Sequence, residues 1–221
     1  MTKVFHVQDL PISGTSINQL HAVKKFDDHL RSFLLKYITQ VEEEVRTLTA
    51  YKFDECNDNG NTPWYDIDAY SPNKSTQQKM EVISSAYSEL SSSKLDYVRF
   101  YMDNHKQIPP WIMLNFSTFI DVIRCSKTDV SHSLCALYGL EDQNGYPNVK
   151  LLIGSLHWMR KIRNSCAHNE RVYCISRKQG FRGQTGRIIE KYLRLLSHGY
   201  SRNMDQKIFD LIVYFKYYLP R

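Results

Sequence analysis

The chain of 221 residues is long enough for a domain with a substantial core, and 42% hydrophobic with 13% aromatic residues exclude wholesale disorder. Nine glycines and seven prolines are few for this length and favour helices over a turn-rich β architecture. The net charge of +6 is concentrated in residues 160–207, where twelve Lys/Arg stand against three Asp/Glu; this basic segment predicts a polyanionic partner, with a solvated basic face as the alternative.

Membrane and export segments are not expected in this sequence. No run of about 18 apolar residues occurs, and the first residues lack the apolar core of a secretory signal. Five cysteines without a Cys-x-x-Cys pair predict a reduced cytoplasmic protein without a zinc site. Cys166 lies two residues before His168 and would point about 200° away from it on a helix, so we interpret it as a buried thiol and not as a nucleophile.

The first predicted element is a long helix. Residues 1–14 form a short arm, and Thr15 or Ser16 can cap a helix that runs to about Tyr51. Apolar residues recur along it at steps of three or four, which suits packing along another helix or a partner chain. These residues are Val23, Phe26, Leu30, Phe33 or Leu34, Tyr37, Val41, Val45 and Leu48. Neighbouring carboxylates at 42–44 diverge by about 100°, so we interpret them as a solvated helix face.

A polar loop with aromatic anchors is predicted for residues 56–75. Trp64, Tyr65 and Tyr70 could stack on bases, or they could pin the loop to the core. Helix returns from Thr76 to about Asn104, and the three serines at 91–93 are a point where it breaks or bends.

The second half of the chain is predicted to hold shorter helices. Proline in a first turn favours a helix over 111–125, and a second helix over 128–138 ends at Gly139. A turn over 141–148 leads into a helix that carries a motif rich in polar residues. A glycine-spaced basic loop follows at 176–187, and helices are predicted at 188–197 and 204–219.

The motif helix carries two stripes at its C-terminal end. Leu152, Leu156, Met159 and Arg163 fall on one stripe, so Arg163 continues an apolar face and needs an anion or a polar partner there. A second stripe lies a little over 100° away. It consists of His157, Arg160, Asn164 and His168.

Residues 163–171 resemble the signature of the Abi-like (abortive infection) branch of HEPN proteins, in which an Arg-x(4–6)-His motif marks RNA-cleaving members. Residues 26–31 and 41–46 resemble that family's Phe-Asp-x-x-Leu-Arg and Ile-Glu-x-x-(hydrophobic)-Arg segments, which belong to a scaffold helix, and residues 108–111 resemble its (hydrophobic)-Pro-x-Trp segment. The resemblance covers about residues 20–175. It implies an all-α, HEPN-like helical bundle with a long N-terminal scaffold helix.

We expect one domain over residues 1–221, with a helical scaffold in 1–107 and a basic, motif-bearing half in 108–221. The resemblance implies a bacterial, cytoplasmic protein that cleaves RNA without a metal or cofactor and leaves 2′,3′-cyclic phosphate and 5′-hydroxyl ends. Arg163 would clamp the phosphate and His168 would transfer protons, while Asn164 orients the histidine or holds a phosphate. The cations expected to bind RNA are Arg160, Lys161, Arg171, Arg177, Lys178, Arg182 and Arg187.

Relatives of this type combine two Arg/His motifs and this chain has one, so the resemblance implies a homodimer with a composite site. The functional hypothesis is a ribonuclease toxin of a phage-defence or toxin–antitoxin system. An alternative is a non-catalytic protein that stably binds a small noncoding RNA, such as an antitoxin RNA. A structural alternative pairs Arg163 with a core carboxylate and leaves His168 as a helix C-cap.

Overall fold

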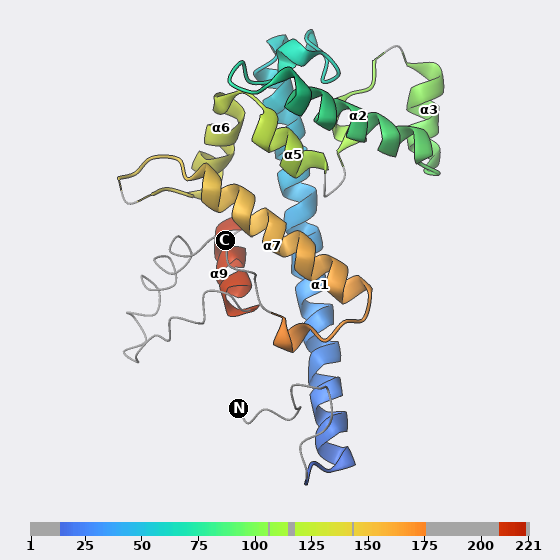
Figure 1. The fold of residues 1–221 in the computed structure, drawn as a ribbon, viewed down its shortest axis with the longest axis vertical. Helices are drawn as coiled ribbons and strands as arrows, with labels where there is room; N and C mark the ends of the chain where they lie inside the picture. Colours follow the sequence, from blue (N-terminus) through green and yellow to red (C-terminus); the bar gives the residue numbers. More distant parts are fainter. Residues whose placement is uncertain (1–13, 106, 115–117, 143, 176–207, 220–221) are drawn as a thin grey trace.

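The longest element of the fold is the helix α1, which spans Ile17–Glu55 and runs along the long axis of the molecule (Figure 1). The computed structural model describes residues 14–105, 107–114, 118–142, 144–175 and 208–219. Ser16 caps α1 in a capping box with Gln19, which confirms the predicted start. The helix continues four residues beyond the predicted end at Tyr51.

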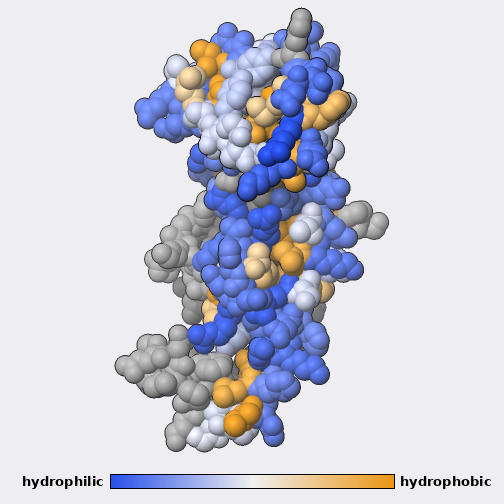
Figure 2. All heavy atoms as spheres, turned by 90° about the vertical axis from the view of Figure 1, so that its right-hand side faces the viewer, coloured by the Kyte–Doolittle hydropathy of each residue, from blue (hydrophilic) through white to orange (hydrophobic). Residues whose placement is uncertain are grey.

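One face of α1 packs into the core while its N-terminal part keeps apolar side chains at the surface. Leu34, Ile38 and Val41 are fully buried, but Phe26 is 49% and Phe33 is 45% exposed. The predicted apolar seam is therefore buried only along the C-terminal part of the helix. In the space-filling view, hydrophobic residues surface as separate patches, one of them at the end of the molecule where α1 begins (Figure 2).

Aromatic residues hold the loop after α1 against the core. The loop contains two short 3₁₀ turns, η1 (Asp58–Gly60) and η2 (Ile67–Ala69). Trp64 and Tyr70 are almost fully buried. The Trp64 ring N–H donates to the Ile108 carbonyl at 2.7 Å, and the Tyr70 hydroxyl donates to the Trp64 carbonyl at 2.7 Å. Pinning of the loop to the core is therefore confirmed for these two rings, which are not accessible to a base.

Helices α2 (Thr76–Ser92) and α3 (Asp96–Asn104) flank the predicted break at the serines. The predicted single helix over 111–125 is wrong, because α4 (Pro110–Met113) and α5 (Thr118–Cys125) are separate. Leu114 leaves helical geometry at φ −82° and ψ 105° and buries its side chain. Leu114 therefore anchors the chain in the core and ends α4, whereas the periodicity of the sequence predicts that the helix continues.

The motif helix α7 (Val149–Ala167) crosses α1 and packs against it (Figure 1). It follows α6 (Thr128–Tyr138), which ends as predicted at Gly139 with φ +62°. The closing helix α9 (Ile208–Tyr218) packs on α7, where the hydroxyl oxygens of Ser155 and Tyr218 lie 2.7 Å apart. The predicted loop at 176–187 and helix at 188–197 lie outside the described residues.

The residues that the structure describes form helices and no strand apart from two isolated bridges, Tyr70–Ser126 and Glu141–Pro147. The predicted all-α class is confirmed. Among these same residues, no helix combines the length and the apolar character needed to cross a bilayer.

Candidate active site

The last turns of α7 change from a buried to an exposed environment. Leu152, Leu156 and Met159 are fully buried, as the apolar stripe predicts. Arg163 continues this stripe, yet its side chain is 41% exposed, and Asn164 beside it is exposed. Arg163 therefore lies at the edge of the core, where its head group reaches an open surface.

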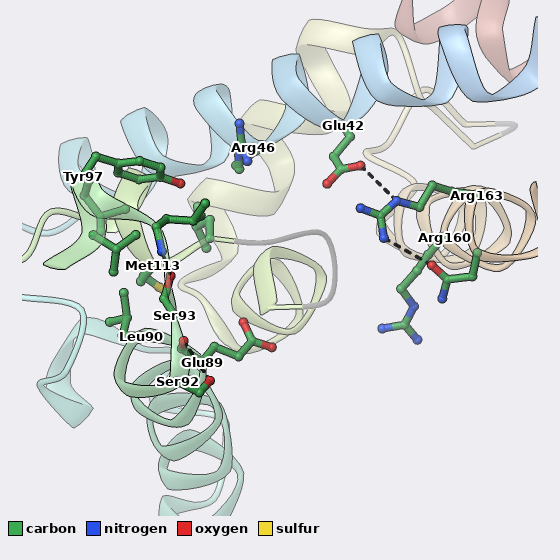
Figure 3. Close-up of a pocket in the computed structure, with 15 residues that line it drawn as sticks. Glu42, Arg46, Glu89, Leu90, Ser92, Ser93, Tyr97, Met113, Arg160 and Arg163 are labelled. Carbon is green, nitrogen blue, oxygen red and sulfur yellow. Dashed lines mark hydrogen bonds and ion pairs between the residues drawn. The ribbon is translucent and has the colours of Figure 1, made fainter. Parts of the chain in front are cut away.

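Arg163 faces a carboxylate of α1. Its Nε lies 3.8 Å from Oε2 of Glu42, and its Nη1 donates to Oδ1 of Asn164 at 3.3 Å (Figure 3). The separation of 3.8 Å exceeds hydrogen-bond length, so this is an ion pair in which the two charges are not tightly locked. The structural alternative for Arg163, pairing with a carboxylate, is thus present in this chain.

Glu42 is not part of a solvated face, and the prediction for this residue is wrong. Its side chain is only 13% exposed, whereas Glu43 is exposed. Burial raises the pKa of the Glu42 carboxyl above its ordinary value, although Arg163 and Arg46 act in the opposite direction. The three carboxylates at 42–44 do point in different directions, as predicted. One of these directions is toward α7, and Glu42 occupies it.

Arg163 and Asn164 line an open hollow of about 560 Å³ between α1, α7 and the α2–α4 region (Figure 3). Arg160 and Arg46 line it as well, so three arginines gather at this place. The full lining consists of Glu42, Arg46, Glu89, Leu90, Ser92, Ser93, Leu95, Tyr97, Val98, Ile112, Met113, Leu114, Arg160, Arg163 and Asn164. The hollow thus combines a cationic end with an apolar one.

His168 is the C-cap residue of α7 and does not line this hollow. Its backbone N–H donates to the Asn164 carbonyl at 3.0 Å, and its side chain is exposed. Asn164 and His168 lie about one turn apart, toward the same side of the helix axis. Within the described part of the chain, no hydrogen bond or ion pair joins the side chains of His168 and Arg163. The structure therefore unites Arg163 with Asn164 and leaves His168 one turn further along.

A buried acid of α1 holds the segment that follows His168. Asp27 is 3% exposed and accepts hydrogen bonds from the backbone N–H groups of Val172 and Tyr173, each at 3.0 Å. Arg31 donates to Asp27 at 2.8 Å and to the Glu170 carbonyl at 3.3 Å. The sequence predicts only a scaffold role for these two α1 residues and does not predict this contact; the available signal was an acid and an arginine four residues apart.

The turn at the end of α7 is stabilised by local contacts. Asn169 adopts a left-handed backbone at φ +56°, a conformation that asparagine tolerates better than most residues. The Glu170 N–H donates to the Ser165 carbonyl at 3.0 Å, and the Ser165 hydroxyl donates to Oε2 of Glu170 at 2.6 Å. These contacts end the helix next to His168 and hold the backbone of that residue in place.

A family model described as Abi-like protein matches residues 3–174, from ahead of α1 through the turn η3 (Val172–Cys174). The chain belongs to the Abi-like family. The Abi-like family points to abortive infection, a form of phage defence. No curated protein and no solved structure matches the chain. The matched range includes Asp27, Glu42 and the whole segment from Arg163 to His168.

Three of the seven predicted RNA-binding cations of this Abi-like chain belong to the residues that the structure describes. Arg160 lines the same hollow as Arg163, and exposed Lys161 has its Nζ 5.4 Å from the centre of the Trp158 ring. Exposed Arg171 lines a second hollow of about 430 Å³ beside the Asp27 cluster. The remaining four lie outside the described residues: Arg177, Lys178, Arg182 and Arg187.

Proposed function

We propose that this Abi-like protein is a metal-independent endoribonuclease of the HEPN type that acts as the toxin of a phage-defence or toxin–antitoxin system. One observation carries the proposal: Arg163 and Asn164 line an open hollow with two further arginines, and exposed His168 follows one turn later on the same helix. A phosphate clamp and a proton-transfer group thus come from the last turn and the C-cap of one helix.

The chemistry requires proton transfer at two oxygens of the RNA. A histidine base takes the proton from the ribose 2′-OH, the 2′-oxygen attacks phosphorus, and the 5′-oxygen leaves with a proton from an acid. Arg163 stabilises the negative charge on the phosphorane oxygens. Asn164, already in contact with Arg163, orients the phosphate from the same side.

A homodimer would supply the second histidine that these two roles need. Each chain has one motif, and a two-fold axis near the end of α7 would bring two copies of it together. Exposed Phe26 and Phe33 on the N-terminal part of α1 support a partner surface there.

Cleavage of RNA in the presence of EDTA tests the proposal. Arg163→Ala and His168→Ala should each abolish cleavage and cellular toxicity while the protein stays folded. Matched controls are Arg124→Ala, which removes an exposed arginine of α5, and His132→Ala, which removes an exposed histidine of α6. Wild-type cleavage by the His168→Ala protein would overturn the catalytic assignment.

The Glu42–Arg163 ion pair favours a second candidate function, a non-catalytic protein that holds a small noncoding RNA. An arginine already paired with a carboxylate can serve a structural role while other cations bind the RNA. This candidate predicts intact RNA that co-purifies with the protein. Its affinity for RNA should fall steeply as the salt concentration rises. This salt dependence should be shallower when four basic residues are replaced together by alanine: Arg177, Lys178, Arg182 and Arg187.

A further inference from the structure

The hollow beside Arg163 extends well beyond the motif. Figure 3 shows Arg163 and Arg160 at one end, Arg46 of α1 in the middle, and Tyr97 of α3 with Met113 of α4 at the other end. Its volume of about 560 Å³ falls within the range of small-molecule sites, roughly 300–1,000 Å³. A motif that needed only to clamp one phosphate would not require the distant half of this space.

The two ends differ in chemistry. The floor at the far end is apolar, since Val98, Met113 and Leu114 are buried there, and Tyr97 presents a ring that is 49% exposed. The near end carries Arg160 and Arg163 against the largely buried Glu42, and Arg46 lies between the two ends. A ligand that fills both ends must therefore combine an apolar, stackable group with at least one negative charge.

We propose that this hollow is a subsite for one ribonucleotide of a single-stranded RNA, next to the phosphodiester that is cleaved. The base lies against Tyr97 and the apolar floor, and its phosphate lies between Arg46 and Arg160. The inference rests on the proposed function, because it takes the cleaved bond to lie at Arg163 and His168. A single strand is required because only an unpaired base can leave its stack and turn toward an aromatic ring.

Asn164 connects this subsite to the reacting group. It lines the hollow and precedes His168 by four residues, which is about 6 Å along the helix axis. A strand that leaves the hollow past Asn164 therefore reaches His168 within a short step. Cleavage would then depend on the nucleotide that occupies the subsite.

Binding by the His168→Ala protein tests the subsite without turnover. The probe is a fluorescently labelled hexaribonucleotide whose dissociation constant is measured by anisotropy. Tyr97→Ala and Arg46→Ala should each weaken binding at least about fivefold, as loss of base stacking and of a phosphate contact predict. Tyr97→Phe keeps the ring and should restore binding to within about twofold. Controls are Tyr146→Ala and Arg99→Ala, which remove an exposed ring and an exposed cation that do not line the hollow.

The outcomes separate this inference from the proposed function. Unchanged RNA binding in both Tyr97→Ala and Arg46→Ala overturns the subsite, whether or not the wild type cleaves RNA. Weaker binding in both variants supports it, even if the His168→Ala protein proves as active as the wild type and the cleavage proposal fails. If Tyr97→Phe weakens RNA binding as much as Tyr97→Ala does, the subsite is also contradicted. Phenylalanine keeps the ring, so base stacking could not then be the interaction that Tyr97 supplies.

Discussion

The buried carboxylate of Asp27 accepts a 3.0 Å hydrogen bond from the backbone N–H of Val172, which lies 145 residues further along the chain. It accepts a second one from the N–H of Tyr173. The chain leaves α7 at His168 and is fixed again at Val172, so this contact sets the path of the segment between them. The position of His168 therefore depends on α1 as well as on its own helix.

Asp27→Ala should lower the free energy of unfolding by about 3 kcal/mol, because two backbone N–H groups and Arg31 lose a buried charged acceptor. Urea denaturation measures this value. Asp28→Ala is the matched control: Asp28 also pairs with Arg31, but its side chain is 45% exposed, so its loss should have an effect below about 1 kcal/mol. Equal losses in the two variants would contradict a special role for Asp27.

Glu42→Gln should increase affinity for RNA at neutral pH by roughly fivefold, since a phosphate no longer competes with a carboxylate for Arg163. In the His168→Ala background, affinity of the parent should rise as pH falls through the raised pKa of Glu42, and Glu42→Gln should remove that part of the rise. Glu43→Gln removes an exposed charge from the same helix and serves as control. A Glu42→Gln protein with the affinity of the Glu43→Gln protein at every pH would refute the competition.

The same shift has a consequence for folding. Because burial raises the pKa of Glu42, the folded protein holds this proton more tightly than the unfolded chain does. The resulting contribution to stability is present below the ordinary pKa of 4.5 and is lost as pH rises through the higher folded-state value. Arg163 is thus paired with a carboxylate that is itself disfavoured by its surroundings, which suits an ion pair that a phosphate replaces.

Cys166 should prove chemically inert although it belongs to the motif. Burial raises the pKa of its thiol to about 11, so it is protonated at neutral pH, whereas Cys174 is exposed. Iodoacetamide at pH 8 should therefore label Cys174 well before Cys166, as peptide mass spectrometry can show. Cys166→Ala should cleave RNA at the wild-type rate; loss of cleavage in a folded Cys166→Ala protein would contradict this interpretation.

Local signals in the sequence predicted much of the helix framework. Ser16 caps α1, Gly139 ends α6, and the serines separate α2 from α3, because caps and breaks depend on a few neighbouring residues. The stop at Leu114 could not be predicted in the same way. It depends on burial of that side chain against elements distant in the sequence.

The candidate site was predictable only in part for the same reason. The resemblance indicated Arg163, Asn164 and His168, and helix geometry put Arg163 on the stripe that packs toward α1. The partners Glu42 and Asp27 come from α1, and which of its carboxylates meets α7 is decided by where the two helices cross. The spacing of residues within either helix does not predict where the two helices cross.

A mixture of wild-type and inactive protein tests whether the site is shared between chains. After subunit exchange with an equal amount of the His168→Ala protein, the wild-type protein should lose about half of its activity, because a mixed dimer holds only one of the two histidines that the reaction needs. Full wild-type activity, despite exchange shown by mass spectrometry of the mixed dimer, would contradict a composite site.

Analysis of the RNA ends after incubation in EDTA is the most direct test of the ribonuclease proposal. We predict fragments with 2′,3′-cyclic phosphate and 5′-hydroxyl ends from the wild-type protein, and intact RNA from the His168→Ala protein. The His132→Ala protein should give the same ends as the wild type. Fragments with 5′-phosphate ends, or no fragments from the wild type under any condition in which it is toxic, would contradict proton transfer by His168 as the basis of the activity.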